Sequence, residues 1–170
     1  MRKFAAWSAI GATLLTGCAS FDGRGLVAGK STATEVAALM GAPSQTVALP
    51  NGDKALYFSR LPAGRAMYVV TVSSDGVMKS IEQRLTRQNL SRIVAGESTR
   101  RYVRELLGPP GLTGRLALQP REWWEYKLRD NYQKRIVWVQ FSDDGLVREV
   151  LDLLDPEEFS PGDGRGGHGN

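Results

Sequence analysis

Two chemically useful residue types are almost missing from this 170-residue sequence, which has one cysteine and one histidine. The cysteine is Cys18, so a disulfide within one chain is excluded. The histidine is His168, in a glycine-rich stretch near the carboxyl end, which removes the commonest general base and metal ligand from the rest of the chain. The sequence therefore predicts no metal, no cofactor and no nucleophilic site built on Cys or His.

Pairs of carboxylates are the remaining source of acid–base chemistry. Glu122 and Glu125 fall in a strand-like segment at a spacing that places them on opposite faces of the strand. Asp143 and Asp144 fall in a turn signal. Because neither pair is expected to converge on a cleft, we predict that the protein is not an enzyme.

Residues 1–17 have the pattern of a secretory signal peptide. Arg2 and Lys3 make the amino end positive, and an apolar run of about a dozen residues follows. That run is too short for a transmembrane helix, which needs about 20 residues. The segment Leu15-Thr16-Gly17-Cys18 resembles the bacterial lipoprotein box, in which the cysteine becomes the first mature residue and carries lipid, including palmitate, on its sulfur and amino group. We therefore expect lipidation at Cys18; the alternative is an apolar cysteine inside an ordinary signal peptide.

The residue after the cysteine bears on the destination of the protein. Ala19 stands where an aspartate would favour retention at the inner membrane, so by the rule of that family we expect the outer membrane, on its periplasmic face. Each buried methylene contributes about 0.8 kcal/mol, and the three acyl chains of such lipoproteins make attachment effectively permanent. Residues 18–27 are then a lipidated tether.

The sequence also has little excess charge, since 22 basic and 18 acidic side chains leave a formal net charge of only +4 at pH 7. Removal of Arg2 and Lys3 with the signal peptide lowers this further, which gives no reason to expect nucleic acid as a partner. Six arginines nevertheless cluster in sequence: Arg84, Arg87, Arg92, Arg100, Arg101 and Arg104. The cluster favours a solvated helical face, and contact with anionic phospholipid headgroups is the alternative.

An internal repeat is the most informative feature that the chain does have. Gly29-Lys30-Ser31-Thr32 and Gly96-Glu97-Ser98-Thr99 begin two copies of one pattern, 67 residues apart. The copies continue with Val36, Leu39, Gly41 and Pro43 in the first and with Val103, Leu106, Gly108 and Pro110 in the second. We predict two tandem modules, residues 28–85 and 86–155, followed by a disordered Gly/Pro-rich tail at residues 156–170.

Each copy opens with signals for helices. Thr32 and Glu35 fit a capping box ahead of a short helix that begins near Ala33, and Gly41 suits its end. Residues 86–94 predict a further helix before the second copy. The equivalent helix before the first copy is interrupted by glycines and is expected to be poorer.

Three strand-like runs follow in each copy, at 122–128, 134–141 and 146–153 in the second. Asp75-Gly76 and Asp144-Gly145 are turn signals between the last two runs. The predicted fold class is therefore α+β, with two tandem modules that each pack two short helices on a three-stranded antiparallel sheet.

The segment Gly29-Lys30-Ser31-Thr32 ends like a phosphate-binding loop. That loop needs a glycine at position 24, where this chain has arginine, and the second copy has lost the lysine. Helix capping explains both copies, so nucleotide binding is not expected.

The middle strand-like run is apolar on both faces. In the second copy Trp138 lies on the face opposite Val137 and Val139, where a half-exposed sheet should be polar. One explanation, which we favour, is that the two copies pack together, because a module of about 60 residues is marginal alone. The other is a protein-binding surface built on Trp123, Trp124, Tyr126 and Trp138.

The order of these motifs resembles the BamE (SmpA/OmlA) family of outer-membrane lipoproteins. The shared features are the pattern from Gly29 or Gly96 to Gly-x-Pro, the aromatic strand Trp124-Glu125-Tyr126, the segment Val139-Gln140-Phe141 and the Asp144-Gly145 turn. The resemblance covers residues 29–85 and 93–153. The first copy departs from it with Leu56-Tyr57-Phe58 at the aromatic strand, and the tandem arrangement departs from a single-module subunit.

This resemblance implies helices packed on a small antiparallel sheet, as in β-lactamase inhibitor proteins. It also implies a non-catalytic, outer-membrane-tethered protein-binding adaptor in envelope integrity or in the assembly of β-barrel outer-membrane proteins, with an outer-membrane or periplasmic protein as its partner. The alternative is a periplasmic inhibitor or ligand-binding module of the same fold.

Overall fold

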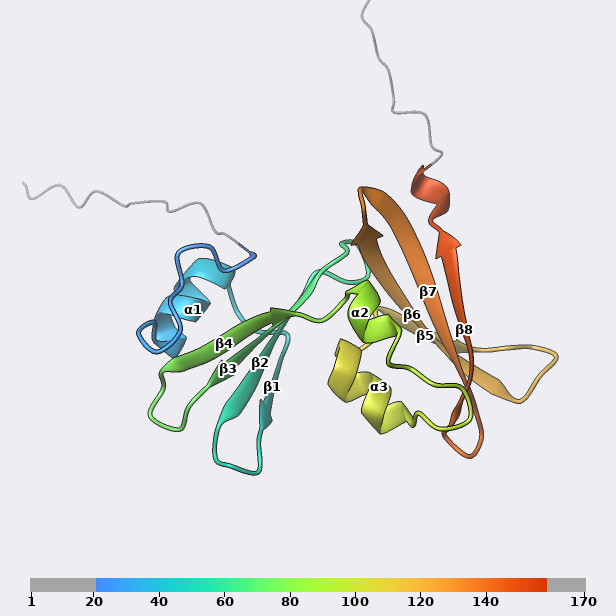
Figure 1. The fold of residues 1–170 in the computed structure, drawn as a ribbon, viewed down its shortest axis with the longest axis horizontal. Coiled ribbons are helices and arrows are strands. Elements are labelled where there is room, and N and C mark those ends of the chain that lie inside the picture. The colour runs from blue at the N-terminus through green and yellow to red at the C-terminus, as the bar shows by residue number, and fades with distance from the viewer. Residues whose placement is uncertain (1–20, 159–170) are drawn as a thin grey trace, which may run out of the picture.

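The computed structural model describes residues 21–158, which form two lobes of helix packed on antiparallel sheet (Figure 1). The first sheet has the order β1 (Gln45–Ala48), β2 (Lys54–Ser59), β3 (Met67–Val72) and β4 (Met78–Gln83), and the second has the order β5 (Leu112–Arg115), β6 (Arg121–Asp130), β7 (Gln133–Ser142) and β8 (Val147–Leu154). The helices are α1 (Ala33–Met40) in the first lobe and α2 (Arg87–Leu90) and α3 (Arg100–Leu107) in the second, and the 3₁₀ turn η1 (Pro156–Glu158) follows β8. The predicted α+β class is confirmed.

Two details of the predicted modules are wrong. Each sheet has four strands instead of three, because β1 and β5 add an edge strand directly after the Gly-x-Pro segment. Both added strands have four residues and are largely exposed, so they carry no hydrophobic alternation that a sequence pattern could reveal. In the described part of the first lobe α1 is the single helix, and Gly23 and Gly25 ahead of it adopt positive φ angles of 73° and 93°.

The repeated Gly-x-Ser-Thr segments make the same backbone hydrogen bonds in both lobes. Gly29 N donates to Met78 O at 2.8 Å, and Gly96 N donates to Val147 O at 2.7 Å. The serine hydroxyls accept from the amides of Val27 and Val94 at 3.0 and 2.9 Å. Each motif thus joins the start of a helix to the start of the last strand of its sheet.

The helix caps follow the predicted pattern. Thr32 accepts from Glu35 N, and the Glu35 carboxylate accepts from Thr32 N at 2.7 Å, which completes a capping box. In the second lobe Thr99 accepts from Tyr102 N without the reciprocal glutamate. The amides of Gly29 and Ala33 donate to carbonyls of the last hairpin, whereas a phosphate-binding loop needs free amides. Helix capping therefore explains this segment better.

The first lobe has its own apolar core between α1 and one face of its sheet. Val36 and Met40 of the helix pack with Phe58, Val70 and Val72 of the sheet. Such a core is what a helix with apolar residues at i and i+4 is expected to build. Several partly buried side chains complete it, including Phe21, Leu26, Leu56 and Tyr68.

The core of the second lobe recruits residues from the first. Its own members come from α3 and from the inner face of the second sheet, and Met67, at the start of β3, is fully buried among them. Tyr57 and Leu61 pack against the same core. The two lobes are therefore in direct contact, and the outer face of β3 is covered by the second lobe at Met67.

An ion pair reinforces this contact at the far end of the second sheet. Arg65, in the loop between β2 and β3, lies 2.5 Å from Asp155, which is almost fully buried, and 2.7 Å from Glu157 of η1. Burial alone would raise the pKa of Asp155, but the amide of Glu157 and the Arg65 guanidinium outweigh burial and hold it below the usual value. Between residues 21 and 158 no helix is long and apolar enough to cross a bilayer.

Candidate functional site

The four aromatic residues predicted to form one binding surface lie on opposite faces of the second sheet. Trp124 and Tyr126 point into the core, where they are 7% and 0% exposed. Trp123 and Trp138 lie on the other face, which we call the outer face, and are partly exposed. The prediction is therefore wrong for Trp124 and Tyr126, because successive side chains of a strand alternate and α3 covers the face that these two share.

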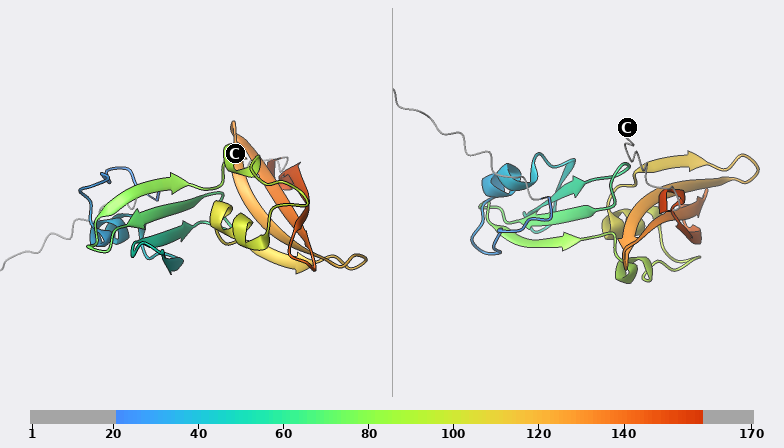
Figure 2. Two further views of the ribbon diagram at one scale, coloured as in Figure 1. Left: turned by 60° about the horizontal axis from the view of Figure 1, so that its bottom comes forward. Right: turned by 90° about the horizontal axis from the view of Figure 1, so that it is seen from above.

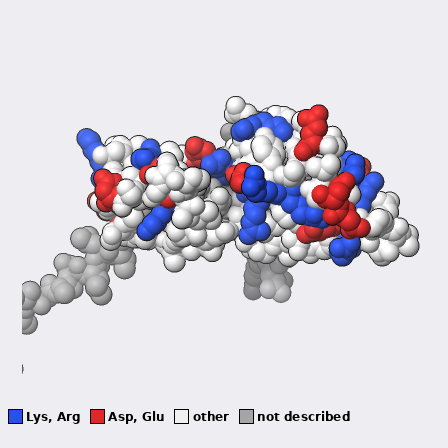
Figure 3. All heavy atoms as spheres, turned by 90° about the horizontal axis from the view of Figure 1, so that it is seen from below, with Lys and Arg blue, Asp and Glu red and all other residues white. Residues whose placement is uncertain are grey.

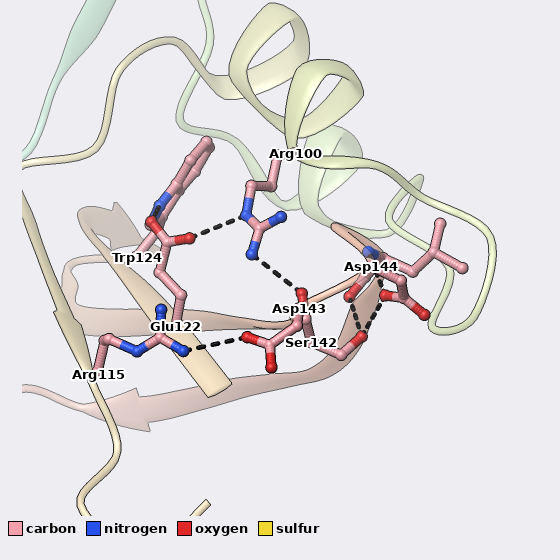
Figure 4. Close-up of polar contacts among 8 residues, drawn as sticks. Arg100, Arg115, Glu122, Trp124, Ser142, Asp143 and Asp144 are labelled. Carbon is pink, nitrogen blue, oxygen red and sulfur yellow. Dashed lines mark hydrogen bonds and ion pairs between the residues drawn. The ribbon is translucent and has the colours of Figure 1, made fainter. Parts of the chain in front are cut away.

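The Trp124 ring is held by contacts inside the lobe (Figure 4). Its indole Nε1 donates to Glu122 Oε1 at 2.6 Å, and the other oxygen of that carboxylate accepts from Arg100 Nε at 2.8 Å. The ring centroid lies 4.7 Å from that of Phe141. Because its polar atom is already satisfied and its ring is buried, Trp124 has a structural role.

Tyr126 is structural for the same reason. Its hydroxyl donates to Gly108 O at 3.1 Å, at the carboxyl end of α3, and burial raises the pKa of the phenol well above its usual value. The hydrogen bond ties β6 to the end of the helix.

The outer face carries a stacked pair of indole rings. The centroids of Trp123 and Trp138 are 5.4 Å apart, and the ring planes are inclined by 24°. Trp138 Nε1 donates to Glu125 Oε2 at 2.8 Å. Trp123 lies against Gly114 of β5, where an added Cβ would come within 2.4 Å of the indole. The glycine is therefore what allows the Trp123 ring to lie flat on the sheet.

Three leucines extend this apolar surface across the sheet. Leu112 on β5 and Leu151 on β8 share a row with Trp138, and Leu153 lies two residues beyond Leu151. Leu112 and Leu153 are 47% and 48% exposed. We call Leu112, Trp123, Trp138, Leu151 and Leu153 the outer aromatic face; it points away from α2 and α3, which lie on the side of the sheet toward the first lobe (Figure 2).

Polar groups on the outer face are paired within the sheet. Gln140 is buried and its side-chain oxygen accepts from Arg121 at 3.1 Å, and Arg121 also lies 3.3 Å from Glu149. Glu125 accepts from Trp138, as described above. A partner that covers this face would leave these polar groups with their hydrogen bonds intact. The free-energy cost of burying the surface is therefore low.

The acidic pairs weighed from the sequence are held apart by the sheet. Glu122 bonds to Arg100 and Trp124 on the inner face, whereas Glu125 bonds to Trp138 on the outer face. Asp143 lies 3.0 Å from Arg115, and Asp144 accepts from Ser142 and Leu146 N in the turn (Figure 4). The pKa of Asp144 is lowered, mainly by the hydrogen bond from the Ser142 hydroxyl. Within residues 21–158 no three His, Cys, Asp or Glu side chains gather as a metal site would require.

The six clustered arginines divide into two groups. Arg87 pairs with Asp130 and Asp152, and Arg100 pairs with Glu122 and donates to Ser142 O at 2.9 Å, so these two hold the second lobe together. Of the other four, Arg101 and Arg104 lie on the exposed side of α3, and Arg92 and Arg84 lie beside it, with Arg84 paired to Glu82 at 3.3 Å. The predicted lipidation residue, Cys18, and most of the predicted tail at 156–170 lie outside the described residues.

Sequence patterns did not single out the leucines of the outer aromatic face. β8 has the sequence Val-Arg-Glu-Val-Leu-Asp-Leu-Leu, in which both sets of alternate residues contain apolar and charged side chains. Alternation therefore does not show which set faces the core. Leu112 belongs to an edge strand that was not expected. The signal that did exist was Trp138 itself, an aromatic residue on the non-core face of a central strand.

Comparisons with known proteins give no family. No protein-family profile matches the chain, and no curated protein matches it in sequence. Two solved structures are similar at low TM-score. A DUF4309 family protein (YjgB) from Bacillus subtilis has a TM-score of 0.31 and 19% identity over 78% of this chain and 84% of that chain. A candidate beta-lactamase inhibitor protein from Streptococcus mutans has a TM-score of 0.29 and 13% identity over 74% of this chain and 84% of that chain. Likeness at this level carries no functional argument, and the resemblance to the BamE family stays a prediction.

Proposed function

We propose that this protein is a non-catalytic binding module of the bacterial envelope. Lipid on Cys18 anchors it to the periplasmic face of the outer membrane, and the outer aromatic face of its second sheet binds another envelope protein. In this proposal the BamE-like adaptor role in envelope integrity or β-barrel protein assembly is retained, with Trp123 and Trp138 as the anchors in place of the four residues predicted from sequence.

The observation that carries the proposal is the stacked Trp123–Trp138 pair on the face of the second sheet that points away from α2 and α3 (Figure 2). Tryptophan is among the residues that contribute most to binding at protein interfaces. The stack holds both rings before a partner arrives, and Gly114 beneath Trp123 and Glu125 bonded to Trp138 hold them further. Rings held in this way lose little conformational entropy on binding.

The shape of the site favours a protein over a small molecule. A small-molecule site would be an apolar cavity, and Trp124 and Tyr126, which could have lined one, are packed inside the core. The exposed rings instead sit on a four-stranded sheet with leucines on either side.

Cross-linking in intact cells tests this proposal. Wild-type protein and the double variant Trp123→Ala/Trp138→Ala would be expressed at equal levels, treated with a cell-permeable cross-linker and purified. We expect the wild type to retain a discrete cross-linked envelope protein and the double variant to lose most of it. A folded double variant that captures the same protein as efficiently as the wild type would refute the proposed face.

Tyr132→Ala is the matched control. Tyr132 is 88% exposed in the β6–β7 hairpin, so the control also removes an exposed ring from the second lobe. It lies outside the outer aromatic face, and we expect its cross-linking pattern to equal that of the wild type.

A periplasmic inhibitor of the same fold is the second candidate, because a stacked tryptophan pair on a sheet face suits binding to an enzyme as well as to an assembly component. An inhibitor would use a binding face of the same kind, so the two candidates differ in the partner. Capture of a periplasmic hydrolase whose turnover stops on binding favours the inhibitor. Capture of an outer-membrane assembly component favours the adaptor.

A further inference from the structure

The second feature of interest is a cleft between the two lobes, which shares no residue with the outer aromatic face. The cleft has a volume of about 220 Å³. One wall is the first sheet, through Gln45 and Val47 of β1 and Tyr57 of β2. The other wall is α3 and the segment after it, through Arg101, Arg104, Glu105 and Pro109. β1 and α3 lie next to each other in Figure 1, and residues of both line the cleft.

The cationic wall of the cleft is weakly neutralised. Arg101 and Arg104 are three residues apart, so they project from the same side of the helix. Among residues 21–158, Arg101 forms an ion pair with Glu105 alone, at 3.7 Å, and both of these side chains are mostly exposed. In the described part of the chain no carboxylate lies within ion-pair distance of the Arg104 guanidinium. A mostly exposed pair of this kind is weak, so a stronger anion can displace Glu105 at little cost.

The same surface continues along α3 beyond Glu105. A second hollow of about 200 Å³ is lined by Arg84, Arg92, Tyr102, Glu105 and Leu106. Arg92 and Tyr102 also line a third hollow, of about 350 Å³. Figure 3, which views this side from below, shows lysine and arginine side chains gathered in the middle of the molecule, where the lobes meet. The hollows thus share residues along one basic track.

The length and shape of this track suit an extended polypeptide. α3 has eight residues and spans about 12 Å, which an extended chain covers with about four residues. β1 is the edge strand of its sheet, so half of its backbone amides and carbonyls face away from β2. An added strand could pair with that edge while its side chains reach α3.

We propose that the cleft between β1 and α3 binds an extended acidic segment of a partner protein. Carboxylates of the segment would pair with Arg101 and Arg104, and an apolar residue would rest on Val47, Tyr57 and Pro109. Guanidinium groups form paired hydrogen bonds with carboxylates, which gives such a site preference for acidic residues over other polar ones.

The lobe contact makes this site a property of the intact chain. Its two walls come from different repeats, and Met67 and the Arg65–Asp155 pair hold those repeats together. Neither repeat alone contains the cleft, which gives a reason for the tandem arrangement.

A direct titration tests the proposal. The full chain in detergent would be titrated into a fluorescein-labelled octapeptide of alternating Glu and Val, followed by fluorescence anisotropy at low salt. We expect saturable binding that weakens with added salt, and no binding of the matching Lys and Val peptide. Arg101→Glu/Arg104→Glu should weaken binding about tenfold or more.

Controls separate this site from net charge and from the outer aromatic face. Arg24→Glu/Arg129→Glu makes the same change in charge elsewhere and should leave the affinity nearly unchanged. Trp123→Ala/Trp138→Ala should also bind the peptide normally, so the two proposals stand or fall separately. Should the Glu variant fail to fold, Arg101→Gln/Arg104→Gln replaces it, with an expected loss of about fivefold.

Three results would overturn the proposal. They are unchanged affinity in the folded Arg101/Arg104 variants, an equal loss in the Arg24/Arg129 control, and arginine-dependent binding to phosphatidylglycerol vesicles with no binding to the peptide. The last result would reassign the cleft to lipid headgroups.

Discussion

Neighbouring tryptophans on opposite faces of β6 should respond very differently to truncation. Trp124→Ala removes a ring that is 7% exposed, packed against Phe141 and hydrogen-bonded to Glu122. Removal of a buried tryptophan costs about 3–5 kcal/mol, because it forfeits burial and leaves a cavity. It also leaves the Glu122–Arg100 pair without its third member.

Trp123→Ala removes a ring on the outer face. The stacking with Trp138 contributes about 0.5–1.5 kcal/mol, and solvent already reaches part of the ring. The loss of stability should therefore be smaller than for Trp124→Ala by about 2–3 kcal/mol.

Urea denaturation followed by far-ultraviolet circular dichroism measures both changes in one buffer. The order of stability expected is wild type, then Trp123→Ala, then Trp124→Ala at a clearly lower urea midpoint. Equal midpoints for the two variants, or a lower one for Trp123→Ala, would refute the assignment of faces.

Four other perturbations test separate features of the protein. Gly41 and Gly108 both end helices with φ near 88°, but only at Gly108 would an added Cβ meet Met67, 2.9 Å away. Gly108→Ala should therefore lower the thermal midpoint more than Gly41→Ala does. Equal shifts would argue against the lobe contact. Arg65→Ala leaves Asp155 buried without its cation and should cost about 3 kcal/mol in urea denaturation, a loss that Glu157→Ala, at the exposed end of the same network, should not reproduce. Folding lowers the pKa of Asp155, so the carboxylate contributes stability above its unfolded pKa of about 4, and this contribution is lost as pH falls through the folded pKa. Asp155→Asn should therefore flatten the acid limb of a curve of stability against pH. An unchanged acid limb would contradict the pairing. Metabolic labelling with palmitate should mark the wild type and not Cys18→Ser, and continued labelling of the variant would exclude that attachment site.

Local chemistry made the repeat and its helix caps predictable from sequence. Thr32, Glu35 and Gly41 act within a few residues of each other, and the bonds that they make depend only on the local backbone. The same holds for the Asp-Gly turns, whose serine neighbours Ser73 and Ser142 also bond within the turn. For such features, spacing alone carries the information.

The division of the tryptophans was not predictable in the same way. Trp123 and Trp124 are adjacent, and sequence gives no sign of which is covered until α3 is placed on one face. Alternation along β7 did place Trp138 correctly, opposite Val137 and Val139. Extending that register across to β6 would have separated Trp124 and Tyr126 from Trp138, but the pairing of β6 with β7 depends on tertiary structure.

Sequence analysis favoured packing of the two copies against each other but could not identify the contacts, because they join residues far apart in the chain. Arg65 meets Asp155 and Glu157 across about 90 residues, and no local pattern marks any of the three. The edge strand β1 and the cleft that it forms with α3 are hidden for the same reason.

Two adjacent leucines of β8 provide the most direct test of the central claim, that the outer aromatic face binds an envelope protein. Leu153 belongs to that face and is 48% exposed, whereas Leu154 is 38% exposed and shares the opposite face with Leu128. A photo-reactive amino acid would be placed at each position in turn and irradiated in living cells. The account predicts a discrete protein cross-link from position 153 and little or none from position 154. Equal cross-linking from both, or cross-linking from position 154 alone, would contradict it.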